Sequence, residues 1–340
     1  MTTRVGFLGA GLIGTFHSKM LRASGADVVW SGVYDPDRAR RDAFASATGA
    51  AACPSEEEVV DGCDALYVCT WTSEHRRLVE MAVAARRHVF CEKPLSTDLA
   101  GATAMADLLR GSDLVHQVGL ILRRSPAFLL LKDLVADPAS GRVMSVVFRD
   151  DQYIPVQGMY ASSWRGDKEK AGSGTLLEHS IHDLDILEHI CGPVASVSAR
   201  SANFHGIDGI EDSVATTVAF ERGGVGTMTS VWHDILERPS LRRVEVFCER
   251  AWIVLEEDDW FGPVSWTRLG VEQRAVRGSD LVAECEARGI AMPNPDGDFI
   301  RCVAEGRPAW PDFDVALRAH RLADAVYRSA AAGGDAVATV

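Results

Sequence analysis

The chain has 340 residues, of which 47% are hydrophobic and 24% are charged, and its formal net charge at pH 7 is −13. These values are typical of a globular protein with an ordinary core, and the length favours two domains. No basic cluster marks a nucleic-acid or membrane-surface site, and no apolar stretch reaches the length of a membrane span.

The N-terminal residues and the cysteines indicate a compartment. A strand is predicted almost from the first residue, so we expect no signal peptide. The eight cysteines are scattered and include no C-x-x-C pair. We therefore expect reduced, mostly buried thiols in a cytoplasmic protein.

Strands and helices alternate over the first third of the chain. One helix is expected to end at Gly49, as helices often do, and another to begin with Ser73 as its N-cap. The predicted strands are 4–10, 26–35, 63–70, 88–93 and 114–120, and the predicted helices are 11–24, 36–49, 73–87 and 96–112. This alternation predicts βαβ units in a doubly wound parallel sheet.

After about residue 122 the apolar residues recur with the period of two that is typical of antiparallel strands. The predicted strands are 142–150, 194–201, 212–221, 224–233, 241–248, 251–257 and 262–269, and the predicted helices are 125–137, 176–190 and about 313–332. We expect an α/β protein with domains at 1–121 and 122–340. The second is an α+β domain with a large open, mostly antiparallel sheet, and whether its last helix packs back on the first domain stays open.

A glycine motif lies between the first predicted strand and the first predicted helix. The sequence GAGLIG places Gly9, Gly11 and Gly14 in a G-x-G-x-x-G pattern. One glycine permits a tight turn, the next lets the backbone approach a pyrophosphate, and the third lets helix and strand pack closely. The helix N-terminus, which includes Leu12 and Ile13, offers N–H groups to the phosphates. The motif predicts a dinucleotide-binding Rossmann domain.

Asp35 is the second signal for a dinucleotide. It ends the next predicted strand, about twenty residues after the motif, where an acid accepts hydrogen bonds from ribose hydroxyls. Its charge would repel a 2′-phosphate, which favours NAD over NADP, whereas the nearby Arg38 weakens this preference. The alternative interpretation is a turn aspartate before Pro36.

Two later strand ends carry polar residues. In an open α/β sheet, ligands bind outside the carboxyl ends of the strands. We therefore expect cofactor contacts from the ends of strands 63–70 and 88–93 and from the helix that follows the first of them. The residues are Thr70, Trp71, His75, Glu92 and Lys93.

The glycine motif, the strand end E-K-P at 92–94, and a later helix with the pattern acid-x-x-x-His-x-x-Asp occur in one chain. Together they resemble the Gfo/Idh/MocA oxidoreductases, and the likeness extends over essentially the whole sequence. These are NAD(P)-dependent enzymes that act mostly on sugars, cyclitols and related compounds.

The resemblance implies roles for individual residues. Lys93 would reach the nicotinamide end and the substrate oxygen, its peptide bond to Pro94 would be cis, and Glu92 would hold the lysine or a ribose. His182 would be the catalytic acid/base, with Glu178 orienting or stabilising its imidazole. For Glu92 and Lys93 the alternative is a surface ion pair.

Residues 178–189 raise the question of a metal. On a regular helix Glu178, His182, Asp185 and His189 would share one face. There is no H-E-x-x-H motif and no cysteine pair, so we expect no metal. The family commonly has Asp at the position of Glu178 and Gly at that of Ser180, and a proline in place of Trp71, so the cleft is expected to be reshaped.

Several residues are candidates for substrate contacts. An aromatic face and a guanidinium, from Trp164 and Arg165, suit a polyhydroxylated or acidic substrate, or they form a rim that packs on the sheet. Asp185 is either a substrate contact or a structural anchor of its helix. The further candidates are Tyr153, Gln157, His233 and Asn294, whereas His17 is interpreted as a packed histidine.

The leading hypothesis is a reversible NAD(H)-dependent oxidoreductase that acts on a secondary alcohol of a sugar, cyclitol or related polyol. The alternatives are a cofactor-retaining lyase or glycosidase of the same family and a non-enzymatic dinucleotide-sensing regulator. The expected partner is a small-molecule substrate, without nucleic acid or membrane. The open sheet predicts a homodimer or homotetramer, because such faces are usually buried.

Overall fold

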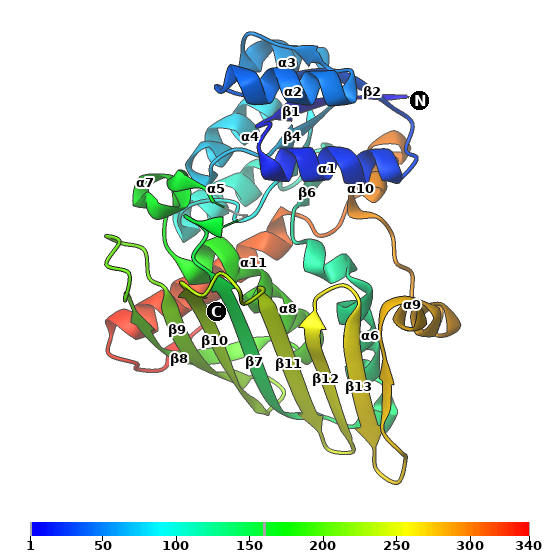
Figure 1. The fold of residues 1–340 in the computed structure, drawn as a ribbon, viewed down its shortest axis with the longest axis vertical. Coiled ribbons are helices and arrows are strands. Elements are labelled where there is room, and N and C mark those ends of the chain that lie inside the picture. The colour runs from blue at the N-terminus through cyan, green and yellow to red at the C-terminus, as the bar shows by residue number, and fades with distance from the viewer. Residues whose placement is uncertain (1, 159–160, 340) are drawn as a thin grey trace. The chain divides into compact units, whose positions relative to one another are not determined.

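The computed structural model describes residues 2–158 and 161–339, and the chain forms two compact units (Figure 1). The first unit comprises residues 1–120 and 293–317, and the second comprises residues 121–292 and 318–340. A single boundary after residue 121 does not describe this arrangement, because residues 293–317 return to the first unit. The division falls within helix α11 (Phe313–Ala331), which contributes to both.

The first unit contains a six-stranded sheet with the order β3-β2-β1-β4-β5-β6, and each neighbouring pair is parallel. Its strands are β1 (Thr3–Leu8), β2 (Val28–Tyr34), β3 (Ala51–Ala52), β4 (Ala65–Val68), β5 (His88–Cys91) and β6 (His116–Val118). The strand order reverses between β1 and β4, so this is the doubly wound arrangement that the alternation predicts.

Helices cover both faces of this sheet. On one face Phe7 and Tyr67 pack with α1 (Leu12–Ala23), α2 (Arg38–Thr48) and α10 (Pro295–Glu305). On the other, Leu8 and Leu66 pack with α3 (Glu56–Gly62), α4 (His75–Ala84) and α5 (Leu99–Leu109). Neighbouring residues of one strand serve opposite faces because strand side chains alternate.

Helix ends in this unit test two expectations. Helix α2 is capped by the Asp37 side chain and ends at Gly49, whose φ of 85° is left-handed, so the predicted end is confirmed. The predicted N-cap at Ser73 was wrong. A 3₁₀ turn (Thr72–Glu74) precedes α4, and Glu74 takes the cap position without a side-chain hydrogen bond.

The second unit contains a nine-stranded sheet with the order β14-β13-β12-β11-β7-β10-β9-β8-β15 (Figure 1). Its strands are β7 (Val143–Tyr153), β8 (Val194–Ala202), β9 (Ser213–Phe220), β10 (Val225–His233), β11 (Leu241–Cys248), β12 (Ala251–Asp258), β13 (Gly262–Arg268), β14 (Arg274–Val276) and β15 (Val337–Ala338). Strands β7 and β10 are parallel, and the other neighbours are antiparallel, which confirms the mostly antiparallel sheet.

One face of this sheet is covered. Helices α6 (Pro126–Ala136), α8 (Ile181–Cys191), α9 (Gly278–Ala287) and the later part of α11 pack with it in one hydrophobic cluster. Outside this layer the unit has a short helix, α7 (Lys168–Ala171). On the opposite face, alternate residues of β9 and β10 are exposed.

The helix expected at 176–190 is interrupted. A π-helical turn (Thr175–His179) is followed by Ser180 and then by α8. The Ser180 N–H donates to the carbonyl of Thr175, and its hydroxyl lies 2.8 Å from Asp150 Oδ2. The prediction of one regular helical face running from Glu178 to His189 was therefore wrong at its first turn.

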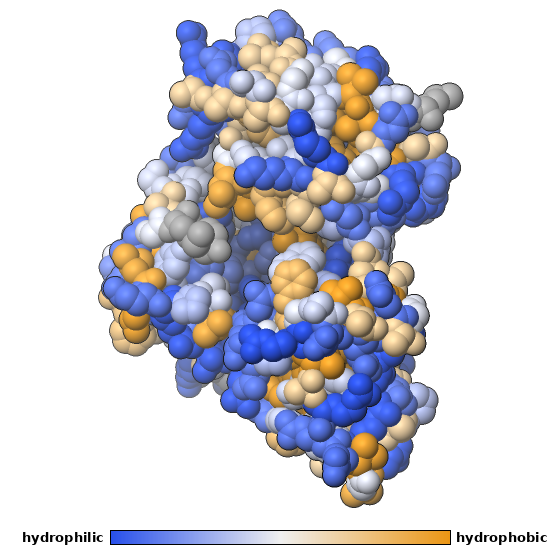
Figure 2. All heavy atoms as spheres, turned by 45° about the vertical axis from the view of Figure 1, so that its right-hand side comes forward, coloured by the Kyte–Doolittle hydropathy of each residue, from blue (hydrophilic) through white to orange (hydrophobic). Residues whose placement is uncertain are grey.

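No helix among the described residues is long and apolar enough to cross a bilayer. Hydrophilic residues cover much of the molecular face shown in Figure 2, with hydrophobic residues interspersed.

Candidate functional site

The glycine loop of the first unit is closely packed around two of its three glycines and has free space beside the third. A Cβ on Gly9, whose φ is +93°, would lie 2.4 Å from the Cys69 carbonyl oxygen. A Cβ on Gly14 would lie 2.2 Å from the Gly9 carbonyl oxygen, whereas one on Gly11 would meet nothing within 4 Å. The packing therefore requires Gly9 and Gly14, and the space beside Gly11 fits the approach of a ligand.

This open space lies at the N-terminus of α1. Gly11 occupies the N-cap position. No side chain among the described residues accepts a capping hydrogen bond there from the first N–H groups of the helix. Leu12 and Ile13 begin the helix, and Leu12 is 58% exposed. Helix N-termini of this kind attract phosphates through their N–H groups and dipole, so the cradle fits the pyrophosphate of a dinucleotide.

Asp35 follows β2 and holds the glycine loop. Its Oδ2 accepts the N–H of Ala10 at 2.8 Å, and its Oδ1 accepts the N–H of Asp37 at 2.8 Å. Each carboxylate oxygen retains a second lone pair that suits a ribose hydroxyl. Arg38 is exposed at the first position of α2.

The ends of β4 and β5 are tied together by His75. This residue is 1% exposed, and its ring has Nδ1 2.9 Å from the Pro94 carbonyl oxygen and Nε2 3.3 Å from the Thr70 carbonyl oxygen. Burial, above all, lowers the pKa of His75. Both ring nitrogens face backbone, so His75 positions these two strand ends, beside which Trp71 is 39% exposed.

The Glu92-Lys93-Pro94 turn begins where β5 ends. The Lys93–Pro94 peptide bond is cis, as the resemblance implies. The Lys93 N–H donates to Glu92 Oε2 at 3.1 Å, and Glu92 is only 7% exposed. A Cβ on Gly119 would lie 2.1 Å from Glu92 Oε1, so this glycine makes room for the carboxylate.

Sequence reasoning missed two charged partners of this turn. His17 is indeed buried, but its Nε2 lies 2.7 Å from Glu92 Oε1 and its Nδ1 lies 2.8 Å from Asp296 Oδ1. Asp296 belongs to the returning segment, and its separation of 279 positions from His17 leaves no local signal. The available hint was that His17 is the ninth residue of a G-x-G-x-x-G-x-x-H stretch.

Asn294 was expected to contact substrate, and the structure gives it another task. Its Oδ1 accepts the N–H of Gly297 at 3.0 Å and caps α10. Its Nδ2 donates to the carbonyl of Met20 at 3.1 Å. Asn294 therefore joins two helices of the first unit.

In the second unit, Trp164, Arg165 and Glu178 form a chain of contacts. The Arg165 guanidinium lies over the Trp164 ring at 4.9 Å from its centroid, and its Nε donates to Glu178 Oε1 at 2.7 Å. Trp164 packs against a small hydrophobic cluster that includes Ile154 and Trp232. The structure thus joins the predicted pair of Trp164 and Arg165 to Glu178, which was predicted separately.

His182 and Asp185 lie on α8. His182 is 9% exposed, in the first turn after the interruption. Asp185 accepts two hydrogen bonds from Arg123, at 2.7 Å and 2.6 Å, which agrees with a structural anchor. Burial, together with Arg123 and Lys132, lowers the pKa of His189 to about 3, so this histidine is neutral near pH 7.

A buried polar network holds the junction between the π-helical turn and α8. Ser180 Oγ contacts Asp150 Oδ2 and lies 2.5 Å from Ser230 Oγ. Arg242 donates to Asp183 Oδ1 at 2.6 Å and lies close to His179. Burial raises the pKa of Asp183, whereas Arg242 and His179 outweigh burial at Asp150 and lower its pKa. The pKa values of these two buried carboxyls thus shift in opposite directions around the Arg242 guanidinium that they share.

The remaining candidates lie at strand ends. Tyr153 and His233 are register partners at the carboxyl ends of β7 and β10, and Tyr153 is 6% exposed. The N–H of Ile235 donates to His233 Nδ1 at 3.1 Å. Gln157 donates to Asp234 at 2.8 Å. Across residues 2–158 and 161–339, no group of three or more His, Cys, Asp or Glu side chains is arranged to hold a metal ion.

Comparisons with known proteins agree with this architecture. Residues 3–120 match the model of an oxidoreductase family with an NAD-binding Rossmann fold, and residues 128–254 match the GFO/IDH/MocA C-terminal domain. The inositol 2-dehydrogenase of Rhizobium meliloti (strain 1021) is 27% identical over 343 residues, which is 97% of this chain and 98% of the relative. The 1,5-anhydro-D-fructose reductase of Ensifer adhaerens is 30% identical over 206 residues, or 60% of this chain and 61% of the relative.

Solved structures share the fold. A levoglucosan dehydrogenase in complex with NADH and levoglucosan superposes with a TM-score of 0.88 at 22% identity, covering 99% of both chains. An inositol dehydrogenase homologue from Azotobacter vinelandii, complexed with NAD⁺, gives a TM-score of 0.86 at 18% identity, covering 99% of this chain and 97% of the other. At these identities the likeness establishes the fold alone.

Proposed function

Because the chain belongs to the Gfo/Idh/MocA family of oxidoreductases with an NAD-binding Rossmann fold, we propose that it is an NAD(H)-dependent dehydrogenase of a sugar, cyclitol or related polyol. The substrate class is supported by relatives named for inositol, levoglucosan and anhydrofructose. The reaction would oxidise a secondary alcohol reversibly. Its location would be the cytoplasm. The eight cysteines are all free, which supports a reducing compartment.

The observation that carries the proposal is the glycine loop. Its open space beside Gly11, its uncapped helix N-terminus and its tie to Asp35 together fit the pyrophosphate and adenosine ribose of NAD. The bound nicotinamide would accept a hydride from the alcohol carbon, or return it to a carbonyl. Thr70, Trp71 and Lys93 would lie toward the nicotinamide end, and Glu92 would fix the Lys93 backbone.

We assign the proton transfer to His182. A neutral imidazole takes the hydroxyl proton as the carbonyl forms, and the imidazolium returns it in the reverse direction. Glu178 would stabilise the imidazolium, and Arg165 fixes Glu178 through the 2.7 Å ion pair. Trp164 and Arg165 would contact the polyol, with Tyr153 and His233 as further candidates.

The test measures NADH absorbance after the protein and NAD are mixed with a panel of cyclitols, aldoses and sugar acids. We expect absorbance to grow with one chemical class. His182→Asn should lower kcat by about a hundredfold or more while NADH affinity changes by less than about twofold, because general acid–base catalysis is lost and the first unit is untouched.

His189→Asn is the matched control, since His189 lies on the same helix and is already neutral near pH 7. It should retain turnover. Equal loss of turnover and NADH affinity in His182→Asn would contradict the assignment of His182. A flat trace across the panel with tight NADH binding would favour the cofactor-retaining lyase or the regulator.

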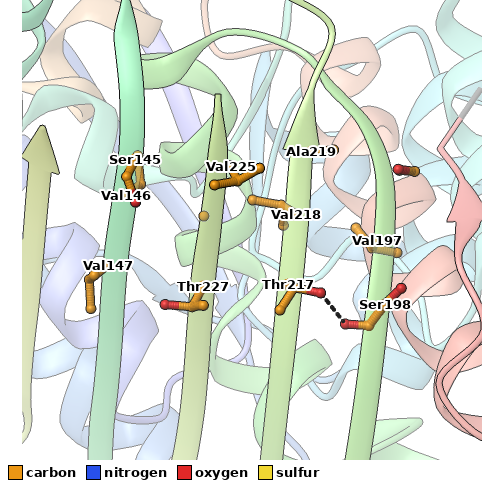
Figure 3. Close-up of a pocket in the computed structure, with 12 residues that line it drawn as sticks. Ser145, Val146, Val147, Val197, Ser198, Thr217, Val218, Ala219, Val225 and Thr227 are labelled. Atoms are coloured by element: carbon orange, nitrogen blue, oxygen red, sulfur yellow. Dashed lines mark hydrogen bonds between the residues drawn. The ribbon is translucent and has the colours of Figure 1, made fainter. Parts of the chain in front are cut away.

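We also propose that the exposed sheet face of the second unit forms a homodimer or homotetramer contact. A shallow hollow on this face is lined by residues of β7, β8, β9 and β10 (Figure 3). Val147 and Val225 are 43% and 60% exposed there, and their neighbours Thr217 and Thr227 are small and uncharged. A sheet face of short, uncharged side chains suits the same face of a second copy.

A further inference from the structure

The triad of His17, Glu92 and Asp296 brings three distant parts of the first unit together. His17 lies on α1, Glu92 follows β5, and Asp296 lies in the first turn of α10. The ring nitrogens are 2.7 Å from Glu92 and 2.8 Å from Asp296. The exposed fractions of the three residues are 1%, 7% and 0%, so solvent does not screen these contacts.

Hydrogen-bond chemistry fixes the charge of the ring. Ionised carboxylates only accept hydrogen bonds, and a neutral imidazole has a single N–H to donate. Where both carboxyls are ionised, the oxygen beside each ring nitrogen can only accept, so both nitrogens carry hydrogen. The ring of His17 is then an imidazolium between two carboxylates.

Titration of this ring depends on the groups around it. Burial alone would lower the pKa of His17, but Asp296 and Glu92 outweigh burial and raise the pKa to about 10. His17 likewise outweighs burial at Glu92 and lowers the pKa of that carboxyl. The other ionisable groups near the triad are Tyr67, Cys69, His75, Cys91 and Lys93. Of these, Lys93 is the cationic side chain.

We propose that His17 and Asp296 are positioning residues that hold the Glu92 carboxylate, and through it the Lys93 backbone, in the geometry that binds the dinucleotide. The inference rests on the proposed function, in which Glu92 and Lys93 belong to the cofactor site. A charge-assisted hydrogen bond from His17 to Glu92 Oε1 fixes the orientation of the carboxylate. Its Oε2 then remains in position to accept the Lys93 N–H.

One consequence concerns residues 293–317. The cofactor site of residues 1–120 lacks one of its three charges until Asp296 arrives from this segment. Without the Asp296 carboxylate, the imidazolium form of His17 is less stable. Glu92 then loses the charged His17 ring as its hydrogen-bond donor. The returning segment is therefore a working part of the cofactor site.

The test compares NADH dissociation constants of Asp296→Asn and wild type by fluorescence titration between pH 6 and pH 9. Asn keeps the shape of Asp and removes its charge, so the pKa of His17 falls. The ratio of the NADH dissociation constant of the variant to that of wild type should be near one at pH 6, where His17 is still protonated in both proteins. At pH 9 it should rise to about tenfold, because a charge-assisted hydrogen bond is lost.

Asp113→Asn is the control, since it removes the same charge from a surface ion pair with Arg86. Its ratio should stay near one at every pH. A pH-independent ratio for Asp296→Asn would overturn the proposal.

A second readout uses the unliganded wild-type protein. Nitrogen-15 NMR of the histidines, with His17 assigned from His17→Gln, should show both of its ring nitrogens protonated at pH 8. A single protonated nitrogen would overturn the proposal even if no variant folds. Failure of the wild type to bind NADH would instead contradict the proposed function, and the NMR result would still decide the state of His17.

Discussion

The stability of the first unit should depend on whether the His17 ring carries its second proton. A group whose pKa is raised on folding contributes stability fully below its unfolded pKa, about 6.5 for histidine. That contribution is lost as the pH rises through the folded pKa, which is about 10 for His17. The difference in unfolding free energy between wild type and His17→Gln should therefore shrink between these two pH values, as measured by urea denaturation.

His88→Gln provides a control of opposite sign. Burial, first of all, lowers the pKa of His88, so its contribution is lost as the pH falls below about 6.5. For each histidine, the unfolding free energy of the variant is subtracted from that of wild type. Between acid and alkaline pH, the two resulting differences should change in opposite directions. A constant difference for His17→Gln over this range would contradict the imidazolium.

Site residues differ in how far the sequence can predict them. The glycine loop, with Asp35 after the next strand, follows from local patterns that one strand and one helix create. Glu92 was recognisable as part of E-K-P, but its partners His17 and Asp296 were not. The first looks like any buried histidine, and the second is brought close by the tertiary fold alone.

At the scale of elements, the π-helical turn is fixed by a carboxylate that sequence reasoning did not single out. Glu211 Oε2 accepts the N–H of Gly174 at 2.7 Å, and its Oε1 accepts the N–H of Leu176 at 3.0 Å and the hydroxyl of Tyr327 at 2.9 Å. A Cβ on Gly174 would lie 1.8 Å from the Glu211 carbonyl oxygen. The turn that carries Glu178 is therefore closely packed against this residue.

Glu211→Gln should loosen the turn, because one of its amide atoms donates and cannot accept the N–H groups that Glu211 serves. We expect kcat to fall by about tenfold as Glu178 and His182 shift, with NADH affinity unchanged. Steady-state kinetics with the substrate class found in the panel measures this. Glu221→Gln, an exposed residue after β9, should behave as wild type, and unchanged kcat in Glu211→Gln would contradict the role of Glu211.

Most of the longer elements follow from their own sequence, whereas the break at Ser180 has a tertiary cause. The longer strands of both sheets were predicted, because one-sided or full burial creates periods that a sequence displays. The short strands β3, β14 and β15 and the helices α3, α7, α9 and α10 were not predicted. The break at Ser180 depends on hydroxyl contacts with Asp150 and Ser230, which lie on β7 and β10. A helical pattern cannot reveal partners on other strands.

For the molecule as a whole, the exposed sheet face gives a prediction about assembly. Val225→Asp places a charge at a 60% exposed position beside the hollow in Figure 3. If this face joins two copies, the variant should have about half the wild-type mass or less in light scattering. Leu269→Asp, at an 83% exposed turn after β13, is the control. A monomeric wild type, or a Val225→Asp variant of unchanged mass, would contradict the contact.

The return of residues 293–317 also has a consequence for synthesis on the ribosome. Asp296 is made 279 residues after His17, so the contact between them has a very long sequence separation. Domains near an N-terminus commonly fold while the rest of the chain is still being made. We therefore expect the nascent first unit to lack α10, and with it a complete charge triad, until most of the second unit has been translated.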